Sequence, residues 1–278
     1  MVFHTIIKNK AGVTGLKVDT LDIYSILFFY SDIMYEAVRT IFAPVDDNLL
    51  IVGEFDLMLV VVSVGVAIFA SFMAMLVASQ SAYIENVVKR RVLSLVASVA
   101  LGGGVWAMHF IGMLAFSLCT PIAYSAGLTA TSTLPSILAS WIALTTITRK
   151  SVSVSRLLLS GILMGAGIGT MHYVGMSAME MAPKLRYDLS TFSLSIAFAV
   201  AFSVLSLWIR FGLTFMNTMR YGKIYRNVIS AIVMGLAISG MHYIGMAAAR
   251  FVRPPGFEFS TQSEYISQYL GFTVALIT

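Results

Sequence analysis

Charged residues are scarce in this 278-residue chain. Asp, Glu, Lys and Arg together make up 11% of it, against about 25% in an ordinary soluble domain, whereas 58% of the residues are hydrophobic. A chain of this composition needs a nonpolar solvent over most of its length. The sequence therefore excludes a soluble globular protein and predicts an integral membrane protein, with the lipid bilayer as its first partner.

Cysteine and histidine are also rare. A single cysteine, Cys119, excludes an internal disulfide framework, and we interpret it as a small apolar residue rather than a ligand. The net charge of +5 does not indicate nucleic-acid binding, because the basic residues cluster in short segments between apolar stretches. The chain has four histidines, and three of them belong to one repeated motif.

Six apolar stretches are long enough to cross a bilayer, which takes roughly 20 mostly apolar residues. A seventh begins after Glu264 and reaches only about 21 Å before the last residue, so we expect the chain to end inside that span. The predicted fold class is all-α, a polytopic transmembrane helical bundle of six complete spans and a truncated seventh. The complete spans are predicted at residues 57–79, 92–118, 128–148, 157–180, 189–209 and 227–249.

Lys and Arg in the connecting segments predict the orientation, since such residues are retained on the cytoplasmic side. Residues 80–91, 149–156 and 210–226 together hold ten of them, and the opposite connections hold four. We therefore expect these three connections in the cytoplasm and the N-terminus outside.

The first 51 residues differ in composition from the rest and lack the pattern of a signal peptide. Apolar residues from Ile23 to Met34 recur at helical spacing, which is typical of a short interfacial amphipathic helix. An ordinary terminal extension fits the same residues equally well. We expect residues 1–51 to be an N-terminal extension and residues 52–278 to be the membrane domain.

One octapeptide, Met-His-aromatic-aliphatic-Gly-Met-x-Ala, occurs three times, always inside a predicted span. An imidazole is costly there unless something binds it. The spans that precede each copy carry matching serines, so the repeating unit is a helical hairpin. The copies are residues 108–115, 171–178 and 241–248.

The three histidines are expected to share one layer, because each follows a basic residue near the start of its span by 16 to 18 residues. They can then converge in the outer leaflet, close to the external water. Neutral imidazole and thioether form a soft ligand set that suits copper. The predicted metal ligands are His109, His172, His242, Met108, Met113, Met171, Met176, Met241 and Met246.

Glycines accompany each histidine at two fixed distances. They can let helices approach closely or leave room for a ligand, and we adopt helix packing as their interpretation. They lie seven residues before the histidine (Gly102, Gly165, Gly235) and three residues after it (Gly112, Gly175, Gly245).

This triple motif on alternate spans resembles the MHYT domain, an integral-membrane sensor module of bacterial signalling proteins, over roughly residues 52–278. The resemblance implies a six- or seven-helix domain in the bacterial cytoplasmic (inner) membrane. It implies Met and His residues that bind copper and thereby sense oxygen, carbon monoxide or nitric oxide, and a cytoplasmic output module or partner protein. This chain departs from the pattern in carrying no output module, and Phe110 stands where the other copies have tyrosine.

Other functions fit the same residues. Histidines on neighbouring transmembrane helices can ligate haem, and a His and Met layer can serve copper transport or storage. Against transport, the inner halves of the spans have no second tier of ligands in register beyond Met164 and Met234. No carboxylate, lysine or activated nucleophile accompanies the histidines, so we expect no enzyme activity. The leading prediction is a copper-binding sensory domain that responds to a gas or to redox state.

Overall fold

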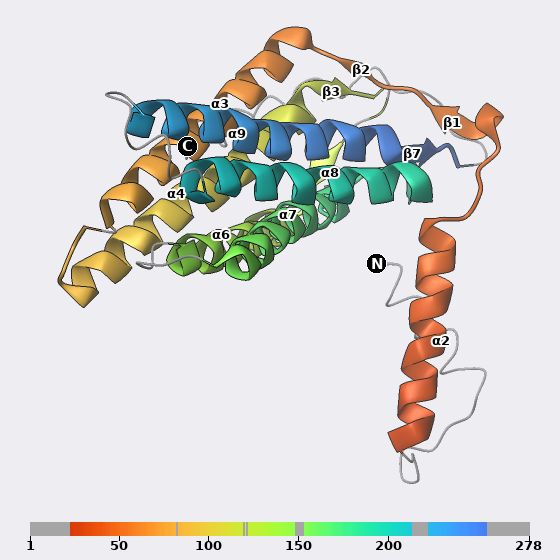
Figure 1. Ribbon diagram of the computed structural model, residues 1–278. Helices are drawn as coiled ribbons and strands as arrows, with labels where there is room; N and C mark the ends of the chain where they lie inside the picture. Colours follow the sequence, from red (N-terminus) through yellow and green to blue (C-terminus); the bar gives the residue numbers. More distant parts are fainter. Residues whose placement is uncertain are drawn as a thin grey trace.

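The computed structural model describes residues 23–81, 83–118, 120, 122–147, 153–212 and 222–254. Six helical segments among them are long and apolar enough to cross a membrane, which confirms the predicted all-α, multi-pass fold (Figure 1). Cys119 and the predicted seventh span lie outside the described residues. The segments are α3 (Leu57–Ser81), α4 (Val87–Leu114), α5 with α6 (Ala126–Thr131 and Thr133–Ile147), α7 (Val154–Ser177), α8 with the π-helical turn η3 (Leu189–Leu207 and Trp208–Gly212) and α9 (Gly222–Ala248).

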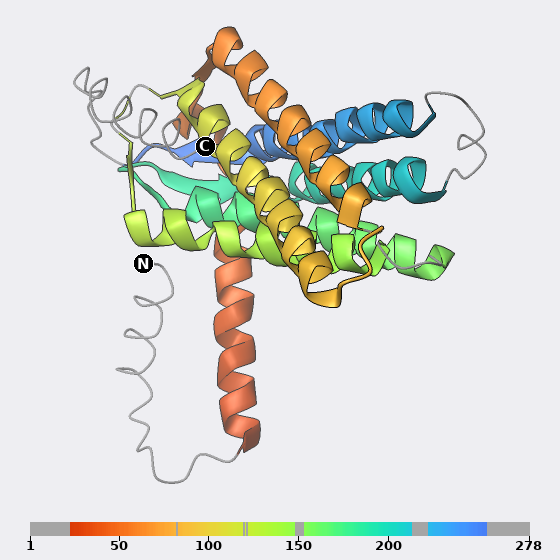
Figure 2. The same cartoon turned by 90° about the vertical axis from the view of Figure 1, so that its left-hand side faces the viewer.

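The helices form an inner and an outer layer (Figures 1 and 2). The inner helices α4, α7 and α9 contact one another, and each outer helix packs between two of them. α3 lies between α4 and α9, α6 between α4 and α7, and α8 between α7 and α9. Each outer helix and the inner helix that follows it form one hairpin, so three hairpins surround a common axis. All three octapeptides are on the inner helices.

The inner helices begin three to five residues earlier than predicted. Lys89 and Arg90, expected in a connection, lie in the first turn of α4, where Asn86 caps the helix by accepting from two backbone N–H groups. Long basic side chains can reach the membrane–water interface from within a helix. Using the basic residues to mark the end of the connection therefore placed the start of α4 too late. We call the end of the bundle where α4, α7 and α9 begin the basic end.

The third span is broken at Ser132. Pro135 has no N–H to donate to the carbonyl of Thr131, and its ring clashes with that turn of a regular helix. α5 therefore ends at Thr131 and α6 begins at Thr133. The hydroxyl of Ser132 donates to the carbonyl of Thr129 at 2.7 Å.

Short antiparallel strands close each hairpin at the opposite end of the bundle, which we call the strand end. The inner helices reach it earlier than predicted, because the last residues of the expected spans form strands. β2 (Glu54–Phe55) pairs with β3 (Phe116–Ser117), β4 (Ala123–Tyr124) with β5 (Met179–Glu180), and β6 (Lys184–Tyr187) with β7 (Ala249–Val252), to which β1 (Leu50–Ile51) adds a third strand.

The last alanine of each octapeptide marks the point where its hairpin closes. Its carbonyl accepts a hydrogen bond of 2.8–2.9 Å from the backbone N–H of the residue just before the outer helix of the same hairpin. These pairs are Ala115 with Asp56, Ala178 with Ser125 and Ala248 with Asp188. At the third of these positions, hydrogen bonds from Ser190 and Thr191 lower the pKa of the Asp188 carboxyl to about 2.

The N-terminal extension contains helix α2 (Ile23–Ile41), as its spacing predicted. A 3-10 turn, η2 (Asp47–Leu49), follows it. Figures 1 and 2 show α2 extending away from the bundle, across the direction of the other helices. It joins the bundle near the strand end, where the ring of Phe42 contacts Phe192 edge-on at 5.1 Å. The interfacial position of α2 stays a prediction.

The glycines seven residues before each histidine serve helix packing, as interpreted from the sequence. A Cβ on any of them would clash with the outer helix of the next hairpin. The helices can therefore touch there only because the side chain is absent. The contacts are Gly102 with Ile137, Gly165 with Val200 and Gly235 with Ile68.

Candidate metal centre

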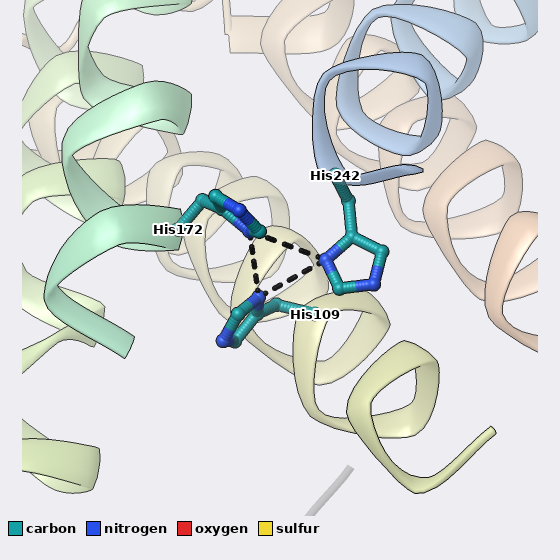
Figure 3. Close-up of side chains that lie close together, drawn as sticks. All are labelled: His109, His172 and His242. Atoms are coloured by element: carbon teal, nitrogen blue, oxygen red, sulfur yellow. Dashed lines mark hydrogen bonds between the residues drawn. The ribbon is translucent and has the colours of Figure 1, made fainter. Parts of the chain in front are cut away.

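The three octapeptide histidines meet on the axis of the inner helices (Figure 3). His109 comes from α4, His172 from α7 and His242 from α9, and each is 0–2% exposed. Their Nδ1 atoms form a triangle with edges of 3.1, 3.2 and 3.2 Å. We call this group the His triad. The structure thus brings together three residues that are far apart in the sequence but equal in depth.

The geometry of the triad fits a bound cation better than it fits hydrogen bonds among the three imidazoles. A charge on one buried ring would be costly, so the rings are neutral, and each has one N–H and one lone pair. A protonated ring nitrogen cannot also accept, so the three Nδ1 contacts cannot all be hydrogen bonds. With the protons on Nε2, three lone pairs converge on one point. The centre of the triangle lies about 1.8 Å from each nitrogen, close to the ~2.0 Å of metal–imidazole bonds.

The glycines three residues after each histidine hold the rings of the triad in place. A Cβ on Gly175 would overlap Nε2 of His109, and the same holds for Gly245 with His172 and for Gly112 with His242. Each imidazole therefore lies against the glycine of the next inner helix, in the cyclic order α4, α7, α9. Helix packing was too general an interpretation for this set, because these glycines face rings of the triad.

The six octapeptide methionines are all buried, in two tiers on either side of the triad. The methionine before each histidine belongs to the core cluster on the side of the basic end, and the methionine four residues after it belongs to a cluster at the strand end. Along each inner helix, the histidine therefore lies between a buried methionine of one cluster and a buried methionine of the other. The first tier is Met108, Met171 and Met241, and the second is Met113, Met176 and Met246.

Two further methionines in the inner halves of the spans are engaged by serines. The hydroxyl of Ser140 donates to the sulfur of Met164 at 3.6 Å, and that of Ser203 donates to Met234 at 3.8 Å. The first hairpin has Leu101 at this position. These two thioethers serve contacts within their hairpins, and they do not extend the triad into a path of ligands.

The aromatic residue of each octapeptide packs on the adjacent histidine and reaches an outer helix. Tyr173 shares a hydrogen bond of 2.8 Å with Ser195 of α8, and Tyr243 shares one of 2.7 Å with Ser63 of α3. Phe110 has no hydroxyl, so the phenol ties an inner helix to an outer one in only two of the three repeats. Sequence reasoning missed this role, although the recurring serines were its signal.

The triad is buried from solvent at the strand end, although each histidine lies less than two turns from the end of its inner helix. An apolar plug covers the triad at this end, and the closeness of the layer to the external water stays a prediction. This plug contains Phe116, Leu118 and Phe251 together with the second methionine tier. Burial raises the pKa of Tyr124 and of Tyr187, which pack against the plug, so both stay neutral.

A cavity of about 510 Å³ lies beside the third octapeptide at the strand end. Its walls include Phe55, Phe116, Tyr243 and Met246. At its rim, Leu57 is 75% exposed. An apolar molecule in this cavity would contact residues that directly follow His242 in the sequence.

Three segments of the chain match the model of the MHYT family, which is described as a bacterial signalling protein N-terminal repeat: residues 102–160, 165–222 and 235–277. This chain belongs to the MHYT family. Each match begins at the glycine seven residues before a histidine, and each therefore includes one arm of the triad. The nine predicted ligands of this MHYT domain all lie within the three matches.

Proteins similar to this MHYT domain are signalling proteins. The chain is 41% identical over 209 residues to the bifunctional diguanylate cyclase/cyclic di-GMP phosphodiesterase MucR of Pseudomonas aeruginosa, and 33% over 222 residues to the signalling protein YkoW of Bacillus subtilis. These alignments cover 73% and 79% of this chain, but 29% and 27% of the relatives, so the chain spans less than a third of their length. No solved structure matches. The protein is a membrane-embedded sensor domain of the kind that signalling proteins contain.

Proposed function

We propose that this MHYT domain binds a copper ion through the Nδ1 atoms of the His triad and thereby senses a diatomic gas or redox state. The convergence of three buried lone pairs between two tiers of thioethers carries the proposal. This soft set favours copper over magnesium or calcium. Bound copper would supply two accessible oxidation states and affinity for oxygen, carbon monoxide or nitric oxide.

The cavity beside Met246 supports the gas-sensing part of the proposal. It is apolar, it is open at the surface near Leu57, and its inner wall includes Tyr243 next to the triad. Small diatomic gases dissolve readily in an apolar environment, so they can reach the plug without crossing a polar barrier.

The alternatives fit these residues less well. A porphyrin needs a wide flat space, whereas the glycines that could have provided one face imidazoles or the backbone of an outer helix. Copper transport needs a path of ligands, whereas apolar clusters adjoin the triad on both sides. Metal analysis with an optical spectrum of the purified protein separates these functions, because haem gives an intense Soret band and copper does not.

The location and orientation belong to the same proposal. We place the domain in the bacterial inner membrane with its N-terminus outside and the basic end in the cytoplasm, because Lys and Arg gather at the segments that begin and end there. The triad then lies in the outer half of the bilayer. A cytoplasmic output module or partner protein would read the position of the inner helices at the basic end.

Topology can be tested with single cysteines in a Cys119→Ser background. A cysteine at position 150 should resist a membrane-impermeant maleimide in intact cells, and one at position 52, where Val52 is 84% exposed at the strand end, should react. The reverse pattern would overturn the orientation and move the triad to the inner half of the bilayer.

Sensing can be tested with single cysteines at positions 89, 150 and 223 of the copper-loaded protein. A ligand shifts a two-state balance only by its differential affinity for the states, and a tenfold difference is about 1.4 kcal/mol. Labelling rates should therefore differ between aerobic and anaerobic samples, and the difference should vanish in His172→Leu. Equal rates in all samples would favour copper storage over sensing.

A further inference from the structure

The cavity of about 510 Å³ at the strand end lies where the inner helix of the third hairpin, α9, meets the outer helix of the first, α3. Tyr243, Met246 and Ala247 of α9 line it, and they share one stripe of that helix because the second and third follow the first by three and four residues. Leu57 and Val60 of α3 line it as well. The cavity therefore follows the two helices from the neighbourhood of the triad towards the strand end.

Aromatic side chains fill the corresponding places between the other hairpins. Between the second and third hairpins, the ring of Phe192 packs on Tyr173, with the ring centroids 4.3 Å apart. Between the first and second hairpins, the ring of Trp106 packs on Phe110 at 5.0 Å, and its Nε1–H donates to the carbonyl of Thr129 at 2.9 Å. A further ring thus covers the octapeptide aromatic residue at each of these two places.

Neither of these rings has a counterpart beside Tyr243. Counted from the residue before each outer helix, Val60 corresponds to Phe192. Counted from each histidine, Ser239 corresponds to Trp106. The repeat therefore lacks a ring at one of its three places, and the missing ring leaves the cavity.

The wall and the rim of the cavity suit a phospholipid. Of the residues that line it, Arg250 alone is charged. Val52 and Leu57 at the rim are 84% and 75% exposed, and exposed apolar side chains of this kind mark contact with lipid or with a ligand. Arg250 is exposed and follows the last residue of α9, at the strand end. A guanidinium has five N–H donors, so the interaction of Arg250 with Asp188 leaves donors for a second anion.

We propose that this cavity binds one acyl chain of a phospholipid, with the headgroup phosphate beside Arg250 and the chain extending along α9 towards Tyr243. Unfilled space forfeits the van der Waals contacts of its walls, and acyl chains are the apolar groups that a bilayer supplies at such an opening. The volume is typical of a ligand pocket.

A bound chain would also fill the space through which we propose that a gas approaches the plug. Lipid binding would then regulate the access of the gas. This regulation rests on the proposed function, whereas the binding of the chain does not.

The test compares two variants of α3 with the wild type. Val60→Phe introduces the ring that α8 has at this position, and Val61→Phe adds the same volume at a side chain that is 65% exposed and is not part of the cavity wall. Each protein, purified in detergent without copper, is incubated with phosphatidylglycerol that carries a photoactivatable diazirine on one acyl chain. After irradiation, peptide mass spectrometry counts the cross-links to residues 243–251. We expect about tenfold fewer cross-links in Val60→Phe, because a packed interior leaves no space for the chain, and wild-type numbers in Val61→Phe.

Ala249→Met serves if thermal denaturation shows that Val60→Phe does not fold. Ala249 lines the cavity, and the second hairpin has Met179 at the corresponding position of its strand pair. This variant should lose cross-links in the same way. Unchanged cross-linking in both cavity variants, or an equal loss in Val61→Phe, would overturn the proposal.

A hexadecane that carries the same diazirine tests whether the occupant is a phospholipid. Arg250→Gln should reduce cross-linking by phosphatidylglycerol and leave cross-linking by the hydrocarbon unchanged. An equal response to both probes would assign the cavity to free apolar molecules and overturn the proposal. Because no copper is present, failure of this experiment leaves the proposed metal site untouched.

Discussion

Replacing His172 by leucine should lower the copper content of the purified protein at least tenfold. Three helices each supply one nitrogen to the triangle, so the loss of one arm leaves a two-coordinate site with no rigid geometry. His109→Leu and His242→Leu should behave alike, because each histidine contacts both of the others. Copper per protein after dialysis, and competition with a chromophoric Cu(I) chelator, measure the effect.

The same variants separate a metal site from simple packing. The three Nε2 atoms are buried without well-formed hydrogen bonds among the described residues, and an unsatisfied buried polar group costs about 1–3 kcal/mol. The metal-free His172→Leu protein should therefore unfold at the same temperature as the wild type or at a higher one. Replacement of His4, the histidine outside the octapeptides, is the matched control for copper content. If all three triad variants kept the copper content of the wild type, the histidines would serve only helix packing.

Gly175→Ala should also lower copper affinity at least tenfold, although glycine supplies no ligand. The new Cβ would overlap Nε2 of His109 and force that ring away from the triangle. Forcing a methyl group into a packed interior costs about 1–3 kcal/mol, so the melting temperature should fall as well. A copper titration and a thermal denaturation curve in detergent measure the two effects.

Gly103→Ala is the control for this prediction. Gly103 is on α4 near the middle of the bundle, and a Cβ there would meet no atom within 4 Å. Alanine stabilises a helix relative to glycine by up to about 1 kcal/mol, so this variant should be at least as stable as the wild type and bind copper normally. Normal copper binding by Gly175→Ala would show that His109 can coordinate from another position.

The glycines three residues after each histidine link the inner helices in a cycle. Gly245 faces His172 and Gly112 faces His242, so each glycine acts on the histidine of another helix. Movement of one inner helix would therefore displace a ring on its neighbour. This coupling offers a physical route from the triad to the basic end of the bundle.

Composition and periodicity alone determined the membrane class, the six spans and the shared depth of His109, His172 and His242. Each of these properties depends on residues close together in the sequence, because hydropathy is averaged over one helix and depth is counted along one helix. The family followed from the octapeptide and its spacing. The starts of α4, α7 and α9 were misplaced because basic side chains extend beyond the apolar part of a helix.

Only the tertiary structure decided how these helices use the same residues. His109 and His242 are 133 positions apart, and their Nδ1 contact depends on how α4 and α9 are rotated and packed. No local pattern specifies the ring that a glycine on a neighbouring helix will face, or the strands and plug that cover the triad. These features arise between helices, where the shape of one surface is set by side chains from another part of the chain.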